Sequence, residues 1–291
     1  MQAGCFPWQY MAAGWRNKQQ EVVMSKLAVI GAGMMGSAIV KGMIQNKVFA
    51  PGDIYISDPA SEKIDQLQQT LGIQKAASNQ EAVKDADAVL IAVKPQFLDA
   101  AISPIREKIP HEALVMTIVA GVPVDYYIHK LDARRIVRIM PNTPAQVGEG
   151  VCGWYATETV TPEQKELAQK ILSALGMQFE VSRESDLDLI TAVSGSGPAY
   201  VYLFIEAMTD AAVQIGLPRP LAQKLALQTV YGSAAYMKTS DKHPVILKNE
   251  VTSPGGTTAA ALAAMEKEGF RTAVTEGILA CLAKTIELGK R

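Results

Sequence analysis

Three glycines with the spacing G-x-G-x-x-G follow a short apolar run near the start of the chain. The run is Leu27–Ile30, and the glycines are Gly31, Gly33 and Gly36. In a dinucleotide site the first glycine permits a tight turn, the second lets a pyrophosphate approach the backbone, and the third lets helix and strand pack closely. Unpaired N–H groups at the start of the next helix then face the phosphates. The spacing therefore predicts a strand, a turn and a helix that together bind a dinucleotide.

A second apolar run ends in an acidic residue where a ribose-binding group is expected. The run is Ile54–Ser57, and Asp58 follows it. The separation of Asp58 from Gly36 is about 20 residues, which is typical of the acid that accepts a hydrogen bond from the ribose 2′-OH. This second strand makes a plain glycine turn a poor explanation of the first stretch.

Apolar runs and helical patterns keep alternating through the first part of the chain. Further strands are expected at residues 73–77, 88–93, 114–119, 136–140, 148–155 and 177–181. This alternation predicts an α/β protein with a Rossmann-like, doubly wound, mostly parallel sheet and right-handed crossovers. In such a sheet the ligand lies at the carboxyl ends of the strands. The stretches expected there are residues 31–36, 92–95, 119–121 and 140–144.

The rest of the chain has helical patterns only. Helices are expected at residues 199–215, 221–237, 244–250, 258–267 and 270–288. They are poor in charge and apolar on more than one side, which is typical of buried helices. In so small a domain this pattern indicates partner helices from a second subunit. We therefore expect a dinucleotide-binding domain over residues 25–184 and an all-helical C-terminal substrate and dimerisation domain over residues 185–291.

Two more glycine-rich stretches precede helices in this half, at residues 194–198 and 251–258. Glycines and hydroxyls at a helix N-terminus can bind an anion such as a substrate carboxylate. Capped helix starts without a ligand are a common alternative. The role of Lys94 also has two explanations, because a lysine directly after a buried strand can contact a ligand or simply be solvated.

Composition excludes several classes of protein. The chain has 291 residues, 48% of them hydrophobic and 20% charged, with a formal net charge of −1. It shows no basic patch for a nucleic acid, and its apolar runs are too short to span a membrane. The three cysteines and three histidines lack the spacing of a disulfide framework or a metal site. We expect a cytoplasmic protein without a metal. Residues 1–24 lack the patterns of the rest and are expected to be an extension outside the fold.

A lysine that is missing from the second half limits the reactions that the chain is expected to catalyse. A hydroxyacid dehydrogenase of the two-domain type needs a lysine about one turn into the helix after Gly195, but no lysine follows until Lys224. Reduction of an imine needs only weak proton donation, since a protonated C=N bond already attracts hydride. Imine reduction therefore fits this chain better than reduction of a ketone.

These motifs resemble those of pyrroline-5-carboxylate reductase, the last enzyme of proline synthesis. The matching stretches are V-I-G-A-G-M-M-G (29–36), A-V-K-P-Q (92–96), R-I-M-P-N-T-P (138–144), S-G-S-G-P-A-Y (194–200) and V-T-S-P-G-G-T-T (251–258). The resemblance implies reduction of L-1-pyrroline-5-carboxylate to L-proline by NADPH or NADH. It implies these cofactor-binding residues: Gly31, Ala32, Gly33, Met34, Met35, Gly36, Ser57, Asn79, Ala92, Val93, Lys94, Pro95, Ile118 and Ala120, to which the spacing described above adds Asp58.

The resemblance also implies a shared substrate site. Family members dimerise through interleaved C-terminal helices and often build decamers from dimers. The substrate then lies between the nicotinamide of one subunit and helix ends from the C-terminal domains. By position, Thr258 would be catalytic and hydrogen-bond the ring nitrogen. The substrate-binding set would be Glu184, Glu250, Ser253, Gly255, Gly256, Thr257 and Thr258.

Two departures from the family pattern matter. The family usually reads Ser-Asn-Arg after the second strand, whereas this chain reads Ser57-Asp58-Pro59. An aspartate repels the 2′-phosphate of NADPH and accepts hydrogen bonds from a free 2′-OH, which favours NADH. The second departure is Glu250, which replaces the family's Asn and leaves a substrate contact there open.

Two other functions remain possible on such a fold. One is a reductase of the β-hydroxyacid or ketopantoate type, which the missing helix lysine disfavours. The other is a non-catalytic nucleotide-binding scaffold, which would not need the hydroxyls of Thr257 and Thr258.

Overall fold

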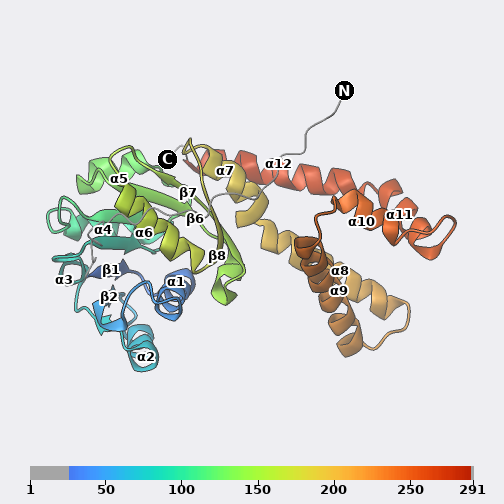
Figure 1. Ribbon diagram of the computed structural model, residues 1–291, viewed down its shortest axis with the longest axis horizontal. Coiled ribbons are helices and arrows are strands. Elements are labelled where there is room, and N and C mark those ends of the chain that lie inside the picture. Colours follow the sequence, from blue (N-terminus) through green and yellow to red (C-terminus); the bar gives the residue numbers. More distant parts are fainter. Residues whose placement is uncertain (1–25, 290–291) are drawn as a thin grey trace, which may run out of the picture.

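The computed structural model describes residues 26–289. It has two parts: a sheet with helices on both faces, and a helical half that extends away from the sheet (Figure 1). The extension expected over residues 1–24 lies outside the described residues.

The sheet has eight strands in the order β3-β2-β1-β4-β5-β6-β7-β8. All neighbouring strands are parallel except β6 and β7, which are antiparallel. This confirms the mostly parallel, doubly wound sheet. The strands are β1 (Leu27–Ile30), β2 (Ile54–Ser57), β3 (Gln74–Lys75), β4 (Ala88–Ile91), β5 (Leu114–Thr117), β6 (Ile136–Met140), β7 (Gly150–Ala156) and β8 (Gly176–Glu180).

Each central strand contributes side chains to two hydrophobic cores. In β1, Leu27 and Val29 belong to the core on one face, while Ala28 and Ile30 belong to the core on the other. This explains why β1, β4 and β5 read as continuous apolar runs, since a strand covered on both faces has no solvent-facing position.

Helices cover both faces of the sheet. One face carries α1 (Met34–Gln45), α2 (Ser61–Leu71) and α6 (Pro162–Ser173). The other carries α3 (Asn79–Val83), α4 (Leu98–Ile102) and α5 (Val124–Leu131). Short 3₁₀ turns at Pro51–Asp53, Pro95–Phe97, Ser103–Ile105 and Thr143–Val147 complete this half.

Element ends differ from the sequence expectations in a few places. Strands expected at 88–93 and 114–119 end at Ile91 and Thr117, because the residues after them turn into loops. The strand expected at residues 177–181 begins one residue earlier, at Gly176. Gly176 has a φ of +134°, and a Cβ there would lie 2.2 Å from the carbonyl oxygen of Gly150 on the neighbouring strand. The backbones of β7 and β8 therefore meet directly at this point.

The helical half begins with α7 (Asp186–Ile190), which passes through a π-helical turn, Thr191–Gly195, into α8 (Gly197–Gln214). The helices that follow are α9 (Arg219–Thr239), α10 (Pro244–Glu250), α11 (Thr257–Lys267) and α12 (Phe270–Gly289). Helix α12 runs back from α11 to the sheet, whereas α10 and α11 lie at the end remote from it (Figure 1). This all-helical second half confirms the rest of the predicted fold class.

The long helices of this half bury few side chains within one chain. Large apolar side chains such as Leu203, Leu227 and Tyr231 are 65%, 58% and 66% exposed. Within residues 26–289, no helix is both long and apolar enough to cross a membrane.

Candidate active site

The glycine-rich loop joins β1 to α1 at the carboxyl edge of the sheet, and its glycines occupy different surroundings. A Cβ on Gly31, whose φ is +109°, would lie 2.8 Å from the carbonyl oxygen of Ala92. A Cβ on Gly36 would lie 2.5 Å from the carbonyl oxygen of Gly31. A Cβ on Gly33 would have no atom of the described residues within 4 Å. Two glycines therefore serve close packing, and the third leaves space above the loop.

That space lies at the N-terminus of α1. Gly33 is the N-cap residue, with extended backbone, and no side chain among residues 26–289 caps the helix. Met34, the first helical residue, is 71% exposed. The first N–H groups of α1 can therefore bind an anion, which fits the phosphates of a dinucleotide.

Asp58 is held against this loop. Its two carboxylate oxygens accept hydrogen bonds from the N–H groups of Ala32, at 2.7 Å, and Ala60, at 2.8 Å. The carbonyl oxygen of the buried Ser57 accepts a further bond from the Gly31 N–H at 2.8 Å. The carboxylate thus has a fixed place beside the loop.

The other residues expected at the cofactor follow neighbouring strands. Ala92–Pro95 come directly after β4, and Lys94 there is exposed and makes no ion pair within the described part of the chain. The Asn79 side chain, at the start of α3, donates a hydrogen bond to the carbonyl oxygen of Ala101 at 2.9 Å. Register pairs Ile30 with both Ser57 and Ile91, so the loops after β1, β2 and β4 begin at the same edge.

A cleft of about 780 Å³ lies between the strand ends and the helical half. Pro95 and Ala120, both predicted from sequence, are in its wall. Met140 and Ser196 are in the wall too, and they belong to the stretches 140–144 and 194–198 that the sequence brought forward. Sequence reasoning missed Tyr126 of α5 and Cys281, Thr285 and Leu288 of α12, because the position of these helices over the sheet leaves no local signal.

Two contacts in the cleft wall involve titratable groups. The Tyr126 hydroxyl donates a short hydrogen bond to Asp99. Burial, and next this hydrogen bond to Asp99, raises the pKa of Tyr126 to about 12. The Cys281 thiol donates to the Ser196 hydroxyl at 3.2 Å, which ties α12 to the glycine-rich segment before α8.

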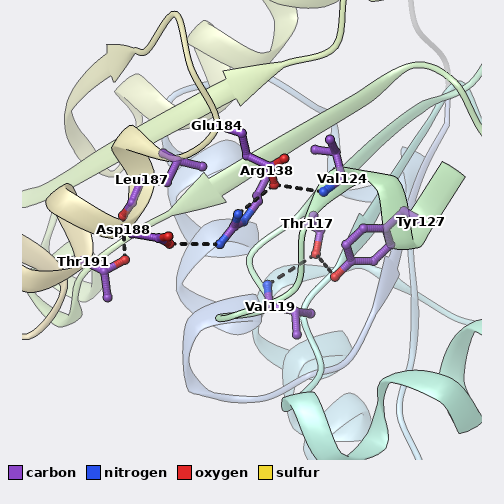
Figure 2. Close-up of polar contacts among 9 residues, drawn as sticks. All are labelled: Thr117, Val119, Val124, Tyr127, Arg138, Glu184, Leu187, Asp188 and Thr191. Atoms are coloured by element: carbon purple, nitrogen blue, oxygen red, sulfur yellow. Dashed lines mark hydrogen bonds and ion pairs between the residues drawn. The ribbon is translucent and has the colours of Figure 1, made fainter. Parts of the chain in front are cut away.

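Glu184 lies at the junction of the two halves (Figure 2). Its Oε1 accepts hydrogen bonds from Arg138 Nη1, at 2.7 Å, and from the Val124 N–H, at 2.9 Å. Asp188 Oδ1 lies 3.7 Å from Arg138 Nη2. Of the residues expected to bind substrate, Glu184 is the one that the structure places beside the strand ends.

The remaining expected substrate residues lie together elsewhere. Ser253, Gly255, Gly256, Thr257 and Thr258 form the turn into α11, at the remote end of the helical half (Figure 1). Gly255 has a φ of +69°, and Gly256 is the N-cap of α11 with no side-chain cap within residues 26–289. A single chain therefore does not bring this turn to the cleft.

Glu250, the last residue of α10, precedes this turn. Its carboxylate accepts a hydrogen bond from Lys242 Nζ at 2.6 Å, and both side chains are nearly half exposed. Within residues 26–289, no three His, Cys, Asp or Glu side chains are grouped so that they could hold a metal ion.

A dinucleotide cradle at the edge of a doubly wound sheet, with a cleft beside it and an apolar helical half, defines a dinucleotide-dependent oxidoreductase. Residues 26–121 match the family "NADP oxidoreductase coenzyme F420-dependent", and residues 184–288 match "Pyrroline-5-carboxylate reductase dimerisation". The chain is 44% identical to the pyrroline-5-carboxylate reductase of Synechocystis over 266 residues, covering 91% of this chain and 99% of that protein. It belongs to the pyrroline-5-carboxylate reductase family.

Other relatives and solved structures of the same family are also similar to this chain. The pyrroline-5-carboxylate reductase of Escherichia coli is 41% identical, with 91% of this chain and 98% of that protein covered. The structure of the Coxiella burnetii enzyme superposes with a TM-score of 0.86 at 35% identity, covering 92% of this chain and all of that one. The Plasmodium falciparum enzyme, crystallised with NADP bound, gives a TM-score of 0.81 at 33% identity, with coverage of 91% and 98%. The predicted family is thus confirmed.

Proposed function

We propose that this chain reduces L-1-pyrroline-5-carboxylate to L-proline, the last step of proline biosynthesis, with a nicotinamide dinucleotide as hydride donor. The observation that carries the proposal is that its relatives of this name match it over 91% of its length, so both the cradle and the helical half are included. A bound NAD(P)H supplies the hydride, and the protein supplies binding and orientation of the protonated imine.

The residues of the cradle fit such a cofactor. The open space at Gly33 and the uncapped start of α1 suit the pyrophosphate. We assign cofactor binding to Gly31, Ala32, Gly33, Met34, Met35, Gly36, Ser57, Asp58, Asn79, Ala92, Val93, Lys94, Pro95, Ile118 and Ala120.

Asp58 makes NADH a competent cofactor in this proposal. Its carboxylate, fixed by two backbone N–H groups, puts a negative charge beside the loop and repels a 2′-phosphate. The same oxygens can accept hydrogen bonds from a free 2′-OH, since each has used only one of its lone pairs. The preference for NADPH should therefore be small or reversed.

The substrate half of the site comes from a second copy of the chain in a homodimer. Two facts support this: the turn into α11 lies away from the cleft of its own chain, and the long helices expose large apolar side chains. N–H and hydroxyl groups of Ser253, Gly255 and Thr257 then hold the substrate carboxylate, while the Gly256 N–H fixes the turn by donating to the Ser253 carbonyl oxygen at 3.0 Å. The resemblance also implies that dimers associate into decamers. Sedimentation measures whether they do.

Thr258 is the catalytic group in this arrangement. Its hydroxyl hydrogen-bonds the ring nitrogen, which keeps the iminium carbon facing the hydride donor. The main contribution of the protein is then orientation of two bound reactants, which can lower a barrier by about 7–11 kcal/mol.

The test is an assay of pyrroline-5-carboxylate reduction with NADH and NADPH in parallel, on the wild-type chain and on Thr258→Ala. We expect proline to form in the wild type, and turnover to fall about 100-fold in the variant with dinucleotide affinity kept. The control is Thr239→Ala, because the Thr239 hydroxyl bonds only carbonyl groups of its own helix. Undiminished turnover in Thr258→Ala would remove Thr258 from the mechanism, and no proline in the wild type would refute the function.

A further inference from the structure

The loop between β5 and α5, residues 118–123, is fixed at its start by a buried pair of hydroxyls. Thr117 Oγ1 lies 2.7 Å from the Tyr127 hydroxyl and accepts a hydrogen bond from the Val119 N–H at 3.3 Å. Both side chains are fully buried, and burial raises the pKa of Tyr127. The loop therefore leaves β5 in one direction, with Ala120 and Gly121 in the wall of the cleft.

The end of the same loop is fixed from far along the chain. Helix α5 begins after Pro123, which has no side-chain hydrogen bond to offer as a cap. Glu184, sixty residues later, supplies the missing acceptor to the Val124 N–H at 2.9 Å. A carboxylate at this position also interacts favourably with the helix dipole. The loop thus runs between two anchors, of which the second comes from the junction with the helical half.

Arg138 fixes Glu184 in turn (Figure 2). It lies on β6, beside β5, and its side chain is 11% exposed. Nη1 donates to Glu184 Oε1 at 2.7 Å, and Nη2 faces Asp188 Oδ1 at 3.7 Å. The planar guanidinium contacts two carboxylates from two sides, which a lysine cannot reproduce. One guanidinium therefore links the sheet, the loop anchor and the first helix of the second half.

We propose that Glu184 and Arg138 are positioning residues for hydride transfer. This rests on the proposed function, in which Ile118 and Ala120 contact the cofactor. Glu184 acts through the loop: it holds residues 118–123 where the strand end meets the nicotinamide, and Arg138 holds Glu184. A misplacement of about 1 Å in such a support can lower a rate about 100-fold.

The competing assignment is direct contact between Glu184 and the substrate. The two assignments predict different kinetics. A substrate contact that is the same in ground and transition states changes KM, whereas a misplaced cofactor changes kcat.

The experiment compares Glu184→Ala, Glu184→Gln and Arg138→Lys in the full-length dimer. We expect kcat to fall about 100-fold in Glu184→Ala, with KM for pyrroline-5-carboxylate nearly unchanged. The isotope effect with cofactor deuterated at the transferred position should rise, because hydride transfer becomes slower than the other steps. Glu184→Gln keeps an oxygen acceptor for the Val124 N–H, so it should retain most activity. Arg138→Lys should lose kcat like Glu184→Ala.

The control is Glu180→Ala, which removes an ion pair of similar length, to Lys165 at 2.6 Å, outside the cleft wall. It should leave kcat unchanged. Amide hydrogen exchange over residues 118–124, measured without substrate, should quicken in Glu184→Ala and Arg138→Lys only. If Glu184→Ala does not fold, Arg138→Lys alone carries the test.

A raised KM with unchanged kcat in Glu184→Ala would place Glu184 on the substrate and overturn the proposal. Unchanged kcat in folded Glu184→Ala or in Arg138→Lys would also overturn it. A wild-type chain that does not reduce pyrroline-5-carboxylate would refute the proposed function instead, and the exchange measurement would still show whether the loop depends on Glu184.

Discussion

Gly33 differs from its two neighbours in the loop because no atom of the described residues occupies the place of its missing side chain. Its backbone, with φ of −69° and ψ of 178°, is one that any residue can adopt. A methyl group there would meet only the ligand. Gly36, by contrast, would place a Cβ 2.5 Å from a backbone oxygen.

The two positions should therefore separate binding from stability. Gly33→Ala should weaken dinucleotide binding at least about tenfold, equivalent to 1.4 kcal/mol, and leave thermal unfolding unchanged. Gly36→Ala should destabilise the fold by about 1–3 kcal/mol because the backbone must shift. Calorimetric titration and denaturant unfolding measure the two effects, and equal loss of stability in both variants would contradict the distinction.

In the proposed function Asp58 sets the preference between NADH and NADPH, and removal of its charge tests this role. Asp58→Asn keeps an oxygen for one of the two backbone N–H groups and removes the negative charge. The ratio of kcat/KM for NADPH to that for NADH should rise about tenfold. The measurement is steady-state kinetics with both cofactors. A wild-type enzyme that strongly prefers NADPH, with no change in the variant, would show that Asp58 does not face the 2′ position.

At the scale of elements, the sequence predicts those whose signals are local. The strands β1, β2 and β6 match their predicted bounds, as does α10, because apolar runs and proline breaks mark their ends. The antiparallel direction of β7 is not visible in a strand pattern. Helix α5 falls within the expected alternation, but its bounds were not predicted, and the acceptor of its first N–H, Glu184, is distant in sequence.

The residues of the candidate site also divide into those with a local sequence signal and those without one. The glycine loop and Asp58 could be found from the sequence, because their spacing within one β–α–β unit defines the chemistry. Tyr126 and Cys281 could not, since tertiary packing alone brings α5 and α12 to the same cleft. The resemblance named Glu184, but only the structure shows its bonds to Arg138 and Val124.

The capping box at the start of α6 is a local sequence signal whose contribution to stability can be tested. Thr161 accepts a hydrogen bond from the Gln164 N–H at 3.3 Å, and the Gln164 side chain accepts one from the Thr161 N–H at 3.2 Å. Thr161→Ala should cost about 1 kcal/mol of unfolding free energy in denaturant titration. Thr161→Ser keeps the acceptor and should stay near wild type, so equal losses in both would assign the effect to the methyl group.

At the scale of the whole molecule, the proposed site draws its cofactor half and its substrate half from different copies. Two inactive variants should then complement each other. Gly33→Asp places a negative charge at the phosphate position, and Thr258→Ala removes the proposed hydrogen bond to the ring nitrogen. A hybrid dimer of the two has one site with both defects and one with neither.

Co-refolding equal amounts of the two variants should therefore recover about a quarter of wild-type activity, since half of the dimers are hybrids with one intact site. The assay is proline formation after refolding, with each variant refolded alone as its control. Activity that stays at the level of the separate variants would mean that both halves of a site belong to one chain.

The anchoring of Glu184 also limits how the length of this chain can change. Residues 181–185 connect β8 to α7 and are fixed at both ends: the Val181 N–H bonds the Trp154 carbonyl oxygen at 2.8 Å, and Glu184 is bonded to Arg138. One inserted or deleted residue would shift the backbone by about 3.3 Å, which is more than a hydrogen bond tolerates. Ser182 and Arg183, both exposed, can be exchanged. Divergence at this junction should therefore proceed by substitution, while gaps in alignments of relatives fall elsewhere.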